Sequence, residues 1–207
     1  MAFSDYKNVA QVQAEYQIKY QEQNFVIPET YTPSQTFLEE FEFNQRHLDV
    51  FSSEAARCEI VIFPIVREVY KHYYNQVSFW VQKPLVYSDK LSGTPDYMIS
   101  KKSDLGKTML ERPLLVVVEA KKNDFEQGWG QCLAELVAIE QFNDEFQQPI
   151  YGIVTDGKLW EFGQLMAQTF TKNIDSFTVT ELSGLMGALK FVFDRAIAAL
   201  SVNLTSC

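Results

Sequence analysis

Three charged residues of types suited to metal-assisted hydrolysis stand at the ends of two apolar segments. Asp96 precedes the first segment, and Glu119 and Lys121 end the second, which reads LLVVVEAK from Leu114. Successive side chains of a strand point to opposite faces, so Glu119 and Lys121 are expected on one face and Ala120 on the other. Charged side chains are rarely buried unless they are paired or bound to metal. The pattern therefore predicts a strand end that borders a cleft holding an ion, water or a partner.

The order of the two segments brings the acidic residues together. The segments are joined by a polar connection, residues 102–112, across which they can form an antiparallel hairpin. In that hairpin Asp96 is expected opposite Glu119, with Cβ atoms about 4.5–5.5 Å apart. Two carboxylates at that distance repel each other. On this basis, Asp96→Ala is expected to leave or raise the stability of the metal-free protein.

A divalent cation would relieve this repulsion. Mg²⁺ favours oxygen ligands, often one or two carboxylates with water and substrate phosphate. The predicted ligands of Mg²⁺ (or Mn²⁺) are Asp96, Glu119 and the backbone carbonyl of Ala120. Lys121 would stand beside the ion and orient a water molecule or offset phosphate charge. A metal-activated water that attacks phosphorus is a well-understood hydrolytic strategy.

Hydrophobic periodicity, caps and turn residues predict the elements that must position these residues. Pro64 should kink or split the helix that contains it. For residues 12–20, strand-like alternation competes with helix-favouring composition, and both assignments stay open. The element order predicts an α/β (α+β) fold, a mixed central sheet flanked by helices. The expected helices cover 33–49, 54–74, 124–142 and from Thr180 or Ser183 to 201, and the expected strands cover 77–87, 94–100, 114–121, 150–156, 159–162 and 177–182.

Composition limits the class of protein. The chain has 207 residues, of which 46% are hydrophobic, enough for one sizeable core, so a single domain over 1–207 is expected. No apolar run reaches the roughly 18 residues that span a bilayer, so no membrane partner is expected. Cys58, Cys132 and Cys207 show no paired spacing, which predicts reduced thiols and a cytoplasmic location.

The charge balance argues against a protein that coats nucleic acid without specificity. The net charge is −9, whereas such proteins carry basic surfaces. Residues 83–122 nevertheless contain eight Lys and Arg against five Asp and Glu. This local excess of positive charge either forms one anion-facing surface or is ordinary scatter of basic residues, and the sequence leaves both readings open.

The residues Gly93-Thr94-Pro95-Asp96, followed by Glu119-Ala120-Lys121, resemble the signature of the PD-(D/E)XK nuclease superfamily. The stretch SEAAR, residues 53–57, resembles the first helix of such domains, which often supplies a further acidic residue, here Glu54 or Glu68. Gln131 matches a glutamine often found on the helix after the motif.

A second stretch carries the same resemblance. Residues 153–160, IVTDGKLW, are similar to a hairpin in the N-terminal nuclease domain of type I restriction enzyme motor subunits. The resemblance covers about 52–162 and leaves 1–50 as an N-terminal extension and 180–201 as a C-terminal helix. It implies a restriction-endonuclease-like fold.

The resemblance also implies an activity, a Mg²⁺-dependent endonuclease that hydrolyses DNA phosphodiesters. Asp96 and Glu119 would be metal ligands, Lys121 the basic catalytic residue, and Glu54 and Gln131 further site residues. Simpler readings stay open for the last two, since Glu54 also suits a helix dipole and Gln131 the polar side of a helix. Some members of the superfamily have lost catalysis, so a catalytically inactive binding or regulatory protein is the alternative. A homodimer or a separate protein partner is a further expectation.

Overall fold

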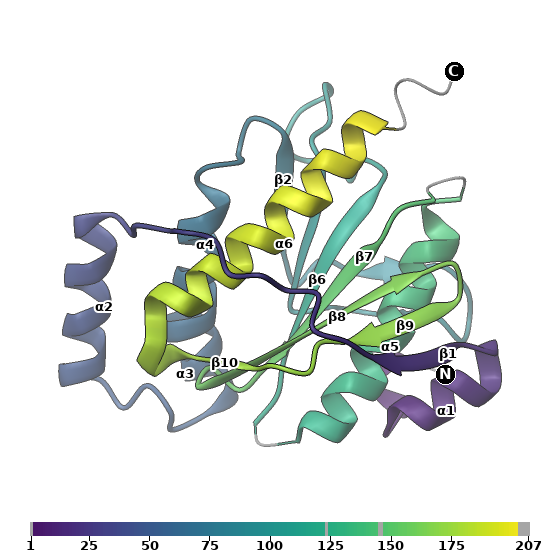
Figure 1. The fold of residues 1–207 in the computed structure, drawn as a ribbon, viewed down its shortest axis with the longest axis horizontal. Coiled ribbons are helices and arrows are strands. Elements are labelled where there is room, and N and C mark those ends of the chain that lie inside the picture. The colour runs from purple at the N-terminus through teal and green to yellow at the C-terminus, as the bar shows by residue number, and fades with distance from the viewer. Residues whose placement is uncertain (1, 123, 145–146, 203–207) are drawn as a thin grey trace.

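The computed structural model describes residues 2–122, 124–144 and 147–202, and Figure 1 shows it as a ribbon. A mixed sheet lies at its centre with helices on both faces, as the sequence predicts. The helices are α1 (Val9–Tyr16), α2 (Gln35–His47), α3 (Glu54–Arg57), α4 (Phe63–Tyr70), α5 (Phe125–Phe142) and α6 (Leu182–Val202), with 3-10 turns at Phe3–Asp5 and Val179–Glu181 and a π-helix at Cys58–Ile62. The strands are β1 (Lys19–Glu22), β2 (Val77–Val81), β3 (Leu85–Val86), β4 (Ser92–Gly93), β5 (Tyr97–Lys101), β6 (Leu114–Ala120), β7 (Ile150–Thr155), β8 (Leu159–Met166), β9 (Thr169–Lys172) and β10 (Phe177–Thr178).

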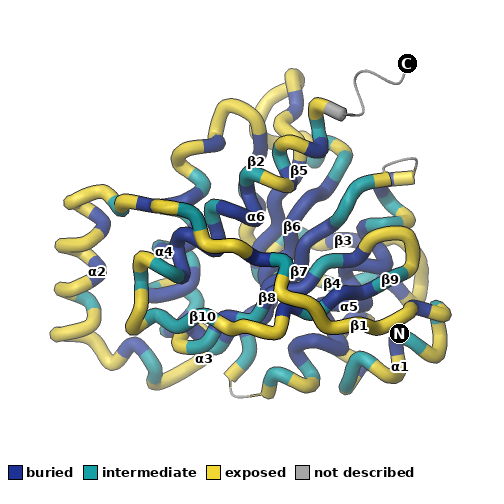
Figure 2. Tube along the Cα trace, in the orientation of Figure 1, coloured by how far each residue is buried: buried dark blue, intermediate teal, exposed yellow. Residues whose placement is uncertain are grey.

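The main sheet has the strand order β1-β9-β8-β7-β6-β5-β2, and β10 pairs with β8. β6 and β7 are parallel because α5 carries the chain back between them, and β1 is parallel to β9. The other neighbouring strands are antiparallel. Every residue of β6 and β7 is buried, as the dark blue tube in Figure 2 shows. A strand covered on both faces needs a continuous apolar run, which explains the sequence LLVVV.

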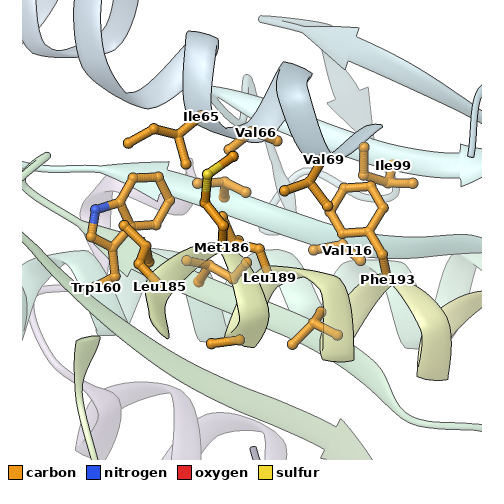
Figure 3. Packing of buried hydrophobic residues seen from close by; sticks show 14 of the residues in the cluster. Ile65, Val66, Val69, Ile99, Val116, Trp160, Leu185, Met186, Leu189 and Phe193 are labelled. Carbon is orange, nitrogen blue, oxygen red and sulfur yellow. The ribbon is translucent and has the colours of Figure 1, made fainter. Parts of the chain in front are cut away.

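Each face of the sheet carries its own hydrophobic layer. On one face α4 and α6 pack together over the strands, and Figure 3 shows Val69 of α4 beside Phe193 of α6. On the other face α1 and α5 cover the sheet. Val118 and Ala120 of β6 belong to the α4–α6 layer, whereas Val117 belongs to the α1–α5 layer. The alternation therefore turns the side chain of Glu119 toward α5.

The first 50 residues are attached to both faces of the sheet. α1 packs on α5, and β1 extends the sheet beyond β9. The chain then crosses to the α6 side, held where the side-chain oxygen of Asn173 accepts bonds from the N–H groups of Phe25 and Val26. The N–H of Glu29 donates to the carbonyl of Gly187 in α6 at 3.1 Å. The undecided region 12–20 thus contains the end of a helix and the start of a strand.

Several element boundaries differ from the sequence predictions. The helix predicted over 54–74 is split, but ahead of Pro64, where the π-helix joins α3 to α4, and it ends at Tyr70. The hydroxyl of Tyr97 donates a 3.1 Å hydrogen bond to the carbonyl of Cys58, the first residue of this π-helix. The strand predicted over 77–87 is β2 followed by the short β3, and β9 was not predicted. The strand predicted over 177–182 is reduced to the two residues of β10.

Across the described residues, no helix combines the length and apolar character needed to cross a membrane. Cys58 and Cys132 are free thiols, the first half-buried and the second buried. Cys207 lies outside the described residues. The cytoplasmic location stays a prediction.

Candidate active site

The hairpin that the sequence predicts is present with the predicted register beside Asp96, and a bulge between Ile99 and Ser100 shifts the register farther along β5. β5 and β6 are antiparallel, and Tyr97 pairs with Val118 and Met98 with Val117. Asp96 stands one residue before β5, beside the end of β6. Its Oδ2 accepts a 2.8 Å hydrogen bond from the N–H of Ala120. Its backbone carbonyl accepts a bond from the N–H of Gln82, so β2 also fixes this position.

Glu119 and Lys121 form an ion pair at the end of β6. Glu119 is only 1% exposed, and its Oε1 lies 2.8 Å from Nζ of Lys121. Its other oxygen, Oε2, is buried and accepts no hydrogen bond from any described residue. The backbone N–H of Lys121 donates to the carbonyl of Thr155, at the end of β7. The stem of Lys121 lies so close to Gly128 that a Cβ added there would be 3.1 Å from its Cγ.

Glu54 lies near these residues, whereas Glu68 does not. Ser53 caps the short helix α3 and leaves Glu54 exposed in its first turn. The charge of Glu54 acts on Asp96 and Glu119, raising the pKa of both. Glu68 is buried and accepts a 2.8 Å bond from the N–H of Ser34, which gives it a structural role in holding α2 against α4.

α5 brings two polar side chains into the interior. Gln131 is buried, with its Nε2 3.3 Å from Oε1 of Glu135, and Glu135 is fully buried. Neither is therefore on a solvated polar side of the helix. Oε1 of Gln131 and Oε2 of Glu135 are buried and, like Oε2 of Glu119, have no hydrogen-bond partner among the described residues. Glu135 was not predicted as a site residue, because its spacing from Gln131 equally suits the polar side of a helix.

Burial and the proximity of the carboxyl groups to one another dominate the electrostatics of the cluster. Burial and the neighbouring charge of Asp96 raise the pKa of Glu119 to about 8, against the opposing effect of Lys121. Burial and the charge of Glu119 raise the pKa of Glu135 well above its usual range. Burial raises the pKa of Asp96, although the Ala120 N–H opposes this. Burial disfavours the charged form of Lys121, but Glu119 outweighs burial and raises its pKa.

The donor set suits a hard cation such as Mg²⁺. Among the described residues, no three His, Cys, Asp or Glu side chains form a cluster that could hold a metal ion by themselves. The predicted set is smaller, two carboxylates from Asp96 and Glu119 and the carbonyl of Ala120, and it leaves positions for water. The orphaned Oε2 of Glu119 is a buried acceptor that needs a cation, a proton or a water molecule. These residues therefore fit the predicted ion.

Seven of the eight basic residues of the segment 83–122 lie at two opposite ends of the β5–β6 hairpin, and the eighth, Lys90, lies between β3 and β4 and pairs with Glu15 of α1. Lys121 and Lys122 follow the end of β6, and Lys83 follows the end of β2 that pairs beside Asp96. Four others are placed at or beyond the far end of β5: Lys101, Lys102, Lys107 and Arg112. The local excess of positive charge is therefore divided between the site end and the opposite end.

Comparisons with protein-family models and with curated proteins find no match for this sequence.

Proposed function

We propose that this protein is a metal-dependent nuclease of the PD-(D/E)XK type that hydrolyses DNA phosphodiester bonds in the cytoplasm. The observation that carries the proposal is the convergence of Asp96, Glu119 and Lys121 at neighbouring strand ends. Asp96 is hydrogen-bonded to Ala120, Glu119 is paired with Lys121, and one buried oxygen of Glu119 has no partner within the described part of the chain. Charges of this kind are retained in an interior when they bind an ion or act on a substrate.

The arrangement of the sheet supports a restriction-endonuclease-like fold. An antiparallel hairpin, β5–β6, leads into the crossover β6–α5–β7, with helices on both faces. The crossover places the first turns of α5 beside the end of β6, where Lys121 lies against Gly128. The proposed site thus stands at the adjoining ends of two strands, beside the first turns of one helix.

Each residue of the site has a distinct task in the proposed reaction. Asp96, Glu119 and the Ala120 carbonyl would hold Mg²⁺ or Mn²⁺, which when bound supplies Lewis-acid activation of water and phosphate. The ammonium group of Lys121 stabilises the negative charge that grows on the phosphate oxygens. Its position is fixed from both sides, by Glu119 at one end and by the backbone of Thr155 at the other.

Two further residues support the site from outside the hairpin. Glu54 supplies negative charge at the exposed side and attracts the cation before it enters. Gln131 lies on the opposite, buried side, beside Glu135. We assign Gln131 and Glu135 to the inner wall of the site, where water or an ion would satisfy their unpartnered side-chain oxygens.

Incubation with single- and double-stranded DNA tests the proposal. Cleavage is expected with Mg²⁺ or Mn²⁺ and not with EDTA. Asp96→Asn and Lys121→Ala should each abolish it, whereas Lys107→Gln, on the exposed connection at the far end of the hairpin, should not. Cleavage that survives both site variants would refute the assignment.

Calorimetry with Mg²⁺ and Mn²⁺ separates the nuclease from an inactive binding or regulatory protein of the same fold. The pairing of Glu119 with Lys121 is the observation that favours the inactive form, because it occupies one candidate ligand oxygen. Metal binding that Asp96→Asn removes supports the enzyme. Absence of binding supports the inactive form. Cleavage that requires a co-purified protein would indicate a nuclease subunit, and light scattering would reveal a homodimer.

A further inference from the structure

A small apolar hollow lies one residue away from Asp96, on the other side of β5. It has a volume of about 380 Å³ and is lined by Glu59, Phe63, Val81 and Tyr97. Tyr97 directly follows Asp96 and pairs with Val81 at the end of β2. A hollow of this volume is within the range of small-molecule sites, about 300–1,000 Å³.

The wall of this hollow is aromatic. The ring of Phe63 lies 5.7 Å from that of Phe79, in a stacked arrangement, and 6.2 Å from that of Tyr97. Tyr97 is almost fully buried, whereas Phe63 is only half-buried and Val81 is 52% exposed. Part of the apolar surface of Phe63 and Val81 is therefore exposed in the hollow. Aromatic rings of this kind stack nucleobases without regard to sequence.

Two charged side chains lie beside the hollow. Arg67 places its guanidinium 5.5 Å from the centre of the Phe63 ring, and its buried Nε has no hydrogen-bond partner among the described residues. No ion pair of Arg67 or of the exposed Glu59 occurs among the described residues. A free guanidinium suits a phosphate oxygen, and a free carboxylate accepts from the exocyclic amino group of a base.

We infer that this hollow binds an unpaired nucleobase next to the scissile phosphate, so that the substrate is single-stranded or locally unpaired DNA. A base inside a duplex is stacked and paired and cannot reach such a hollow without leaving the helix. Glu59 favours adenine, cytosine and guanine, which carry exocyclic amino groups, over thymine, which does not. This inference rests on the proposed function for its substrate, but it concerns binding and not cleavage.

Binding of labelled single-stranded homopolymers in EDTA tests the inference, because no cleavage can occur. Poly-dA and poly-dC should bind more tightly than poly-dT, and all should bind more tightly than a duplex. Phe63→Leu, which keeps apolar volume but removes the ring, should weaken binding roughly 5- to 100-fold, the range expected for one lost stack. Glu59→Gln should reduce the preference over poly-dT, because a glutamine amide can donate to the thymine carbonyl.

Controls keep this test separate from the test of catalysis. Arg67→Gln should lower affinity and reduce the salt dependence by about 0.7 in the logarithmic slope, the effect of one phosphate contact. Lys107→Gln should change neither property. Glu59 is exposed, so Glu59→Gln should fold. The inference would be overturned if the protein bound the three homopolymers with equal affinity and Glu59→Gln had no effect on binding. A protein that binds in this pattern but never cuts would refute the nuclease and leave the base site standing.

Discussion

The backbone N–H of Ala120 donates a 2.8 Å hydrogen bond to Oδ2 of Asp96. The bond joins the start of β5 to the end of β6 through a side chain, at the position where the backbone ladder stops. Asp96 therefore has a structural task as well as its proposed metal-binding one. This bond was not predicted, and it changes the expected effect of removing the carboxylate.

Asp96→Ala is now expected to destabilise the metal-free protein, by about 1–3 kcal/mol, because the Ala120 N–H loses its acceptor. Asp96→Asn keeps an acceptor oxygen and should be near wild type in stability, although it should lose metal binding. Urea denaturation of the metal-free variants measures the difference. Equal stability of Asp96→Ala and wild type would show that repulsion between the carboxylates cancels the bond.

The buried carboxyl of Glu119 predicts a pH dependence of stability. Its pKa is about 8 in the folded protein, against an ordinary value of 4.5. The folded state therefore holds a proton that the unfolded chain has lost, and the free energy of unfolding falls as pH rises from about 5 to about 8, by up to about 1.4 kcal/mol per pH unit. Denaturation of the metal-free protein across this range checks the sign.

Glu119→Gln is the matched control for this titration, because it keeps the shape and removes the ionisable group. It should flatten the pH dependence. A slope that stays unchanged in Glu119→Gln would assign the effect to other groups. Since metal must displace this proton, added Mg²⁺ should raise the midpoint of thermal unfolding more at the alkaline end of the range than at the acid end.

The close packing around Gly128 of α5 predicts that a larger residue there lowers both stability and activity. A Cβ at this position would lie 2.7 Å from Cγ1 of the buried Val154 and 3.1 Å from Cγ of Lys121. Gly128→Ala should therefore cost about 1–3 kcal/mol through overpacking and displace Lys121, with a loss of cleavage on the order of a hundredfold. Gly184→Ala in α6 is the control, since its Cβ would meet nothing within 4 Å. It should keep full activity, and a similar activity loss in both variants would exclude the proposed displacement.

Glu54 should contribute to metal affinity modestly, because it is exposed and its charge is screened. Glu54→Gln is expected to weaken Mn²⁺ binding by roughly two- to five-fold. Glu40→Gln, an exposed acid of α2, removes the same charge from a helix that does not contribute to the site. Calorimetric titration compares the two, and a complete loss of binding in Glu54→Gln would make Glu54 a direct ligand.

The hairpin was predictable because its signals are local and consistent. A continuous apolar run that ends in charge predicts a strand buried on both faces, and β6 is such a strand. The predicted register is observed from Tyr97 to Ile99, beside the site, whereas a bulge between Ile99 and Ser100 shifts it next to the connection of residues 102–112. Asp156 and Gly157 are a local signal of the same kind. They form the turn between β7 and β8, where Gly157 has a φ of 86°.

Other elements were not predictable because their causes are distant in the sequence. The turn before β9 uses Ala167 and Gln168 with positive φ, so glycine does not mark it. The burial of Glu135 depends on the packing of α5 between the sheet and α1, which no local pattern of polar residues reveals. β1 is short and each of its residues is exposed. It forms a strand because it pairs with β9.

The pairing of β1 with β9 also constrains the order in which the chain can fold. Gln21 reaches Thr171, 150 residues later, and Asn173 holds Phe25 and Val26. During synthesis residues 21–26 leave the ribosome well before their partners, Thr171 and Asn173. Contacts so distant in sequence form slowly because a long loop must close. We therefore expect residues 19–26 to dock after β7, β8 and β9 have paired with one another.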